Sequence, residues 1–194
     1  AEVRLLDMVS AYSVFADDGV RRDPVAILRI ERSGNVLHEE VNEEAYVLDP
    51  EVARRIDSIL SDNAARTPVF GPRSPLAFPG NTVAAKTGTT QGFRDAWTVG
   101  FTRTIAAGVW VGNNGNRPMR QGSDGVFVAA PIWRSFMDRA MPKYDAMPFA
   151  AYVPNVEGRN RLIAGGGVHR YVEDDSGKDT KKEKGGKKKR SKKG

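Results

Sequence analysis

The stretch VAAKTGTTQGFRDAWTVGFT, residues 83–102, combines an apolar run with one lysine, three glycines and several threonines. Lys86 is one of only two lysines in the first 177 residues, which contain 18 arginines. A chain that favours arginine this strongly but has lysine here indicates a position that needs a compact ammonium group rather than a planar guanidinium. The β-branched and aromatic residues after the threonines indicate that this stretch belongs to a sheet.

Three strands are predicted around this lysine, at residues 82–89, 96–101 and 105–112. The link TRT at residues 102–104 is short enough for an antiparallel hairpin between the last two strands. Trp97, Trp110 and Trp133 lie on periodic apolar faces, so we interpret them as core residues rather than ligand platforms.

Helices are expected on both sides of these strands in the sequence. Apolar periodicity predicts helices at residues 3–16, 49–63 and 130–141, the first ending near Gly19 and the second capped by Asp49 before Pro50. A β-hairpin with its turn at residues 33–35 and a proline- and glycine-rich loop at residues 67–81 lie between them. The predicted fold class is therefore α+β, an antiparallel sheet flanked by helices.

Charge separates the end of the chain from the rest. The 194 residues carry a formal net charge of +6, but the segment from Lys178 onward has ten basic residues against Asp179 and Glu183. The first 177 residues are therefore slightly acidic, and we expect a disordered lysine-rich tail at residues 174–194 after an irregular linker at residues 142–173. Such a tail can attract anionic polymer or lipid headgroups, without specific recognition of nucleic acid.

Residues 86–90, KTGTT, are suited to binding a carboxylate at a strand edge. Thr87 and Thr89 are two residues apart, so their hydroxyl groups lie on one side of the strand, and Gly88 lets another backbone come close. An extended peptide could pair with this edge as an added strand, and a backbone N–H there could stabilise an oxyanion. An ordinary polar strand end remains the alternative interpretation of these five residues.

The longer pattern KTGTTQGFRDAW.VGFT...AAGVWVGN resembles the third active-site motif, and the two strands after it, of class A penicillin-binding proteins. AYSVFADDGVRRDPVAI upstream and GVWVGNNGNRPM and APIWRSFM downstream are similar to further elements of that family, so the resemblance covers residues 1–141. It implies a β-lactamase/transpeptidase-like fold and a serine-type D-Ala-D-Ala transpeptidase that cross-links peptidoglycan through an acyl-enzyme.

The resemblance also implies roles for individual residues. Lys86 would help activate the serine of the family's second motif, S-x-N, and hold the charge of the substrate, and the Thr89 N–H would be an oxyanion donor. Thr87, Gly88 and Thr89 would bind the carboxylate of a D-Ala-D-Ala stem peptide or of a β-lactam, and Thr90 would extend that edge. The family's chemistry needs no cofactor and no metal, and none is expected here.

The serine of the family's S-x-x-K motif is absent, because none of the ten serines has a lysine three residues later. SDN at residues 61–63 is spelled like the second motif, but it lies too close to Lys86 and is interpreted as a helix end. We therefore expect residues 1–141 to be the C-terminal portion of a transpeptidase domain, inactive alone. The parent would be anchored at the outer face of the bacterial cytoplasmic membrane, and its missing N-terminal part would be a partner of this chain.

A second interpretation remains open on the residues alone. The chain could be a non-catalytic module that binds peptide carboxylates or polyanions, with the lysine-rich tail as its affinity element. The long ordered match around Lys86 favours the transpeptidase.

Overall fold

The computed structural model describes residues 2–41 and 43–153, which centre on a three-stranded antiparallel sheet. The strands β5 (Ala84–Thr89), β6 (Asp95–Phe101) and β7 (Ala106–Gly112) lie in the order β5-β6-β7. Lys86 is opposite Val99, and Thr98 is opposite Val109. The three predicted strands, the hairpin between the last two and the α+β fold class are confirmed.

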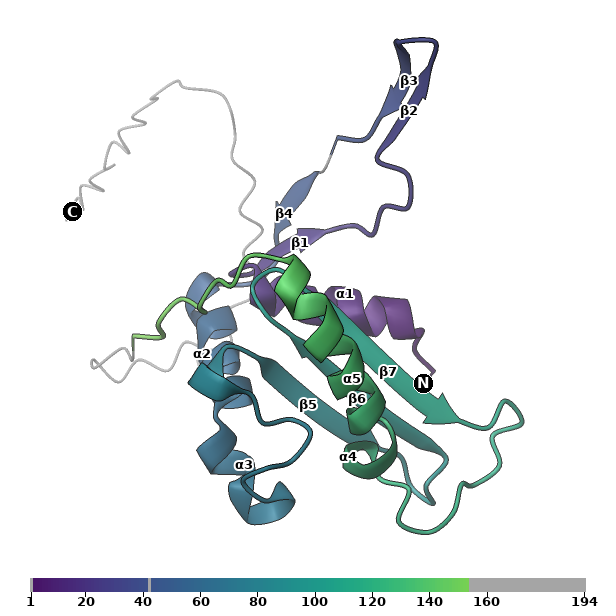
Figure 1. Ribbon diagram of the computed structural model, residues 1–194, viewed down its shortest axis with the longest axis vertical. Helices are drawn as coiled ribbons and strands as arrows, with labels where there is room; N and C mark the ends of the chain where they lie inside the picture. The colour runs from purple at the N-terminus through teal and green to yellow at the C-terminus, as the bar shows by residue number, and fades with distance from the viewer. Residues whose placement is uncertain (1, 42, 154–194) are drawn as a thin grey trace, which may run out of the picture.

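Helices pack on both faces of this sheet (Figure 1). Helix α1 (Leu5–Ala16) covers one face, where a Cβ on Gly108 would lie 2.6 Å from Val9. Helix α5 (Ala130–Ala140) covers the other, where a Cβ on Gly100 would lie 2.3 Å from the ring of Trp133. The small residues of the sheet thus let both helices approach closely, and Trp133 is fully buried as predicted.

The helix ends follow the predicted capping. Gly19 N–H donates to the Val14 carbonyl at 2.8 Å after Asp18, whose φ of 51° is left-handed, so α1 ends in a Schellman arrangement. Helix α2 (Pro50–Ser61) begins where the Asp49 side chain accepts a hydrogen bond from Glu51 N–H. Both predicted caps are therefore present, with Asp18 rather than Gly19 as the first left-handed residue.

The predicted hairpin projects from the body of the molecule (Figure 1). It consists of β2 (Arg29–Arg32) and β3 (Asn35–Glu39), whose residues are all exposed. Ser33 and Gly34 both have positive φ, as a two-residue turn between twisted strands requires. A separate pair, β1 (Val20–Arg22) and β4 (Glu44–Tyr46), connects this hairpin to the body.

Two short helices were not predicted. Helix α3 (Asn63–Phe70) extends into the expected loop because Asp62 ends α2 and immediately caps a new helix, accepting from Ala65 N–H at 3.1 Å. Helix α4 (Gly125–Val128) is a single turn before α5. A 3₁₀ turn also occupies Pro79–Asn81, and another, Met141–Lys143, follows α5.

The expected linker and tail fall largely outside the described residues. No helix or strand is found in residues 144–153, whereas residues 154–173 of the linker and the tail at 174–194 are not described. Within the described parts of the chain, no helix combines the length and apolar character needed to cross a bilayer.

Candidate functional site at the edge of β5

The edge of β5 that faces away from β6 presents backbone groups at the lysine–threonine stretch. Thr90 N–H donates to the Asp95 carbonyl at 3.0 Å, so the even-numbered residues of β5 form the hydrogen-bonded pairs with β6. The N–H and C=O groups of Ala85, Thr87 and Thr89 consequently point to the open side of the strand. This geometry provides the free edge that pairing with an extended peptide requires.

Two cations lie at this edge. Lys86 is exposed, and its Nζ bends back to donate to the carbonyl oxygen of Thr87 at 2.5 Å. Arg66 of α3 donates to the Leu60 carbonyl at 2.9 Å and reaches the Ala85 carbonyl at 3.5 Å. Burial lowers the pKa of Arg66, but an arginine starts so far above neutrality that it keeps its charge. The edge is therefore electropositive beside Thr87 and Thr89.

Thr87 and Thr89 share the face of the sheet that α4 and α5 cover, opposite to Lys86. Thr87 is half-buried, whereas Thr89 is exposed. The Oγ1 of Thr89 accepts a hydrogen bond from Gly125 N–H at 3.1 Å. A ligand at the open edge would thus meet an ammonium group from one side of the strand and hydroxyl groups from the other.

Gly88 was expected to permit a close approach by another backbone, and the structure shows where that approach occurs. A Cβ on Gly88 would make an ordinary contact of 3.5 Å with Trp97. A Cβ on Gly125 would lie 2.7 Å from the Gly88 carbonyl oxygen and 2.4 Å from that of Trp97. The close approach at Gly88 is therefore made by α4 of the same chain, and Gly125 is the position that has to be a glycine.

The polar groups of Thr90 are engaged inside the turn after β5. Its hydroxyl donates to Asp95 Oδ2 at 2.8 Å, and Asp95 N–H donates back to that hydroxyl at 2.9 Å. Trp110 Nε1 donates to the other oxygen of Asp95 at 2.9 Å. Asp95 thus steadies the turn, and the Thr90 side chain is bound within the turn rather than at the open edge.

The SDN triplet at residues 61–63 is a helix junction in the structure. Ser61 ends α2, Asp62 caps α3, and Asn63 Nδ2 donates to the Pro72 carbonyl at 3.2 Å. His38 is exposed in the projecting hairpin, and His169 lies outside the described residues. The interpretation of SDN as a helix end is confirmed.

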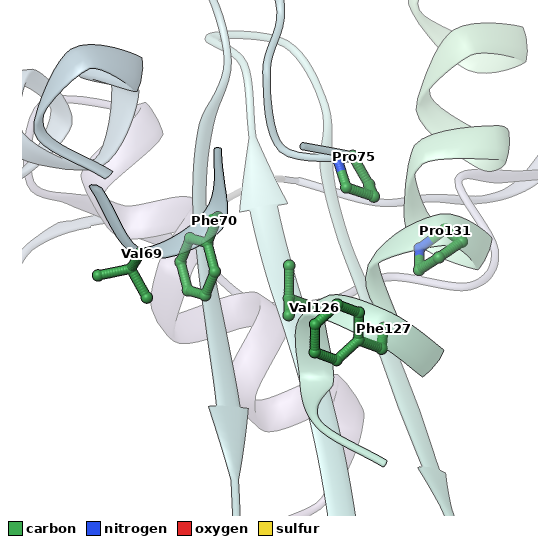
Figure 2. A pocket seen from close by; sticks show the side chains of 6 residues that line it. All are labelled: Val69, Phe70, Pro75, Val126, Phe127 and Pro131. Carbon is green, nitrogen blue, oxygen red and sulfur yellow. The ribbon is translucent and has the colours of Figure 1, made fainter. Parts of the chain in front are cut away.

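A small apolar hollow of about 190 Å³ lies between α3 and α4. Figure 2 shows Val69 and Phe70 on one side of it and Val126 and Phe127 on the other. Pro75 and Pro131 complete its lining. It contains no group that could carry charge or transfer a proton, so it flanks the β5 edge without adding chemistry to it.

Sequence reasoning missed Arg66 and Gly125. The sequence around Arg66 does not distinguish it from other arginines of a helix or loop. Its contact with the Ala85 carbonyl exists only because α3 lies beside β5. Gly125 lies in SDGVF, which reads as a loop, and nothing local shows that strand carbonyl groups crowd it. The roles of these two residues at the β5 edge can therefore be recognised only from tertiary contacts, not from the local sequence pattern.

Comparisons with known proteins cover most of this chain. The family described as "Penicillin binding protein transpeptidase domain" matches residues 2–138. Penicillin-binding protein 1A of Aquifex aeolicus (strain VF5) is 35% identical over 173 residues, covering 84% of this chain and 23% of the relative. Penicillin-binding protein 2D of Bacillus subtilis (strain 168) is 34% identical over 145 residues, covering 72% of this chain and 20% of the relative.

Solved structures share the fold. Penicillin-binding protein 1A from Haemophilus influenzae superposes with a TM-score of 0.66 at 22% identity, over 78% of this chain and 28% of that one. An imipenem acyl-enzyme complex of penicillin-binding protein A from M. tuberculosis gives a TM-score of 0.56 at 20% identity, over 72% of this chain and 31% of that one. The chain spans about a quarter of the length of the relatives it matches.

Proposed function

The chain belongs to the penicillin-binding protein transpeptidase domain family, and on that premise we propose that its β5 edge is one wall of a D-Ala-D-Ala transpeptidase site in peptidoglycan cross-linking. The observation that supports this most directly is the open edge at Thr87 and Thr89, with the ammonium group of Lys86 folded onto it. The substrate would be a stem peptide ending in D-Ala-D-Ala, and β-lactams would occupy the same edge. The reaction would take place outside the cytoplasmic membrane, where peptidoglycan is assembled.

Each residue has a role that follows from its position. A peptide carboxylate beside Lys86 gains a charge-assisted interaction, which is stronger than one between neutral groups. The hydroxyl groups of Thr87 and Thr89 add donors on the opposite face of the strand. The N–H of Thr89 points to the open side, where it can donate to a carbonyl oxygen that becomes negative during acyl transfer.

The chain supplies binding and oxyanion donors but no S-x-x-K serine, so acyl transfer needs a nucleophile from outside these 194 residues. We therefore assign recognition, not bond making, to this chain alone. The alternative of a polyanion-binding module rests on residues 174–194, which lie outside the described residues.

Titration by two-dimensional NMR with diacetyl-L-Lys-D-Ala-D-Ala tests this proposal. We expect amide shifts at Thr87 and Thr89 that saturate, and much smaller shifts with the same peptide amidated at its C-terminus. Lys86→Met should weaken binding by roughly tenfold, as loss of a charge-assisted contact of about 1.5 kcal/mol predicts. Lys143→Met is the matched control, because Lys143 lies in the turn after α5. Equal binding of acid and amide would overturn the proposal.

A further inference from the structure

We infer that Gly125 is a positioning residue of the carboxylate-binding edge, which acts by holding the hydroxyl group of Thr89 through its N–H. This inference rests on the proposed function of the β5 edge and adds a residue to it. Gly125 begins α4 and is buried, and no charged or nucleophilic group is needed for its role.

The first step concerns the hydroxyl itself. A threonine hydroxyl has one proton to donate and two lone pairs that accept. Gly125 N–H, 3.1 Å from Thr89 Oγ1, occupies one lone pair from the side of α4. The Thr89 proton cannot lie along the line to that N–H, and because the residue is exposed, the proton can be donated to a ligand at the strand edge. The bond from Gly125 thereby restricts the orientation of the hydroxyl and leaves its proton available to a carboxylate.

The second step concerns what holds Gly125 in place. The fully buried Thr98 donates its hydroxyl to the Gly125 carbonyl at 3.2 Å, so both backbone groups of Gly125 are bound to threonines of the sheet. The absence of a side chain lets this backbone lie against β5 and β6, since a Cβ would be 2.4 Å from the Trp97 carbonyl oxygen. Thr89, Gly125 and Thr98 thus form a connected unit, which we call the α4 latch.

The third step is the consequence for binding. Without the latch, the Thr89 side chain would sample several χ1 rotamers, and ordering it on binding would oppose affinity. Loss of the latch should therefore weaken recognition of the acid peptide while recognition of its amide stays unchanged. A merely structural role would lower both to the same extent or affect neither.

The latch is tested without any ligand by hydrogen exchange of the Gly125 amide and by three-bond couplings that report the Thr89 χ1 rotamer. We expect a slowly exchanging amide and a single rotamer in the wild-type chain. Thr89→Val should speed exchange of the Gly125 amide at least tenfold, and Thr89→Ser should restore it. An unprotected Gly125 amide, or rotamer averaging at Thr89 in the wild-type chain, would overturn the inference.

The effect on recognition is tested with Thr98→Val, which removes the bond from the sheet to the Gly125 carbonyl without touching Thr89 and leaves that carbonyl only the Ala129 N–H at 3.1 Å. We expect the dissociation constant of diacetyl-L-Lys-D-Ala-D-Ala to rise three- to tenfold, with Thr98→Ser close to wild type. Thr104→Val, at an exposed site beyond β6, is the control. Unchanged affinity in a folded Thr98→Val chain with an averaged Thr89 rotamer would overturn the positioning role. Failure of the wild-type chain to bind the peptide would instead refute the proposed function. Hydrogen exchange of the Gly125 amide and the three-bond couplings of Thr89 would then still test whether the α4 latch exists.

Discussion

The indole N–H of Trp110 donates to the carboxylate of Asp95 at 2.9 Å, which joins β7 to the turn that follows the lysine–threonine strand. The other oxygen of that carboxylate accepts from the Thr90 hydroxyl at 2.8 Å. One side chain therefore fixes both the end of β5 and its distance from the far strand of the sheet. The geometry of the open edge at Thr89 depends on it.

Asp95→Ala should lower the free energy of unfolding by about 1–3 kcal/mol, because it leaves the half-buried Trp110 N–H without its acceptor and removes the bond to the exposed Thr90 hydroxyl. Urea denaturation followed by tryptophan fluorescence measures this change. Asp138→Ala is the control: that carboxylate is half exposed and pairs with Arg134 one helical turn away, so its removal should change stability by less than about 1 kcal/mol. Similar losses in the two variants would contradict a special role for Asp95.

Asp57 of α2 should make stability depend on pH. Its side chain is buried with neither oxygen hydrogen-bonded, and burial, followed by the nearby charge of Asp18, raises its pKa to about 7, with Arg103 opposing the shift. Between about pH 4 and pH 7 the folded chain holds a proton there that the unfolded chain has lost. The free energy of unfolding should therefore fall as the pH rises through this range, by about 2–4 kcal/mol.

The contribution of Asp57 is isolated by comparing the wild-type chain with Asp57→Asn. The pKa of Asp18 is lowered although burial, the largest influence, opposes this, because hydrogen bonds from Arg103 and Arg54 outweigh it. Asp18 therefore makes the free energy of unfolding rise with pH, in a more acidic range than the one in which Asp57 acts. This contribution is the same in the wild-type chain and in the Asp57→Asn variant. Urea denaturation at several pH values should show the variant more stable than wild type at pH 8 and similar to it at pH 4. Parallel curves for the two chains would mean that Asp57 titrates normally.

The parts of the fold that local patterns specify were predicted from the sequence. Alternation and β-branching located the three strands, and Asp49 before Pro50 located the start of α2. The apolar stripe of α5 is only partly covered: Ile132 and Phe136 belong to it but are 55% and 48% exposed. Helical periodicity shows that a stripe exists but not how much of it the three-stranded sheet can cover.

The candidate site shows the same division. KTGTT could be recognised as a polar strand edge because residue spacing alone places Thr87 and Thr89 on one face. Arg66, Gly125 and the buried Asp57 could not be recognised, because each depends on contacts between elements far apart in the sequence. Thr90 was assigned to the binding edge by the family resemblance, and its hydroxyl is bound to Asp95 five residues later.

Gly100→Ala should destabilise the chain by about 1–3 kcal/mol or more, because the new methyl group would lie 2.3 Å from Trp133 and 2.7 Å from the Ala84 carbonyl oxygen. Neither the fully buried indole nor a strand carbonyl has room to retreat. Thermal unfolding should show a lower midpoint. Gly115→Ala is the matched control, since nothing lies within 4 Å of the position of its Cβ, and it should unfold like the wild type.

The 194-residue chain should not be acylated by penicillin. Acylation requires a serine activated by the lysine three residues after it, and none of the ten serines has such a lysine. Lys86 cannot replace that lysine, because its Nζ is bound to the Thr87 carbonyl and no S-x-x-K serine exists for it to serve. Incubation with a fluorescent penicillin, followed by a denaturing gel, should show no labelled band, while a penicillin-binding protein that contains S-x-x-K is labelled in the same experiment. A labelled band that disappears on substitution of one serine would identify an unexpected nucleophile and would restore acyl transfer to this chain alone.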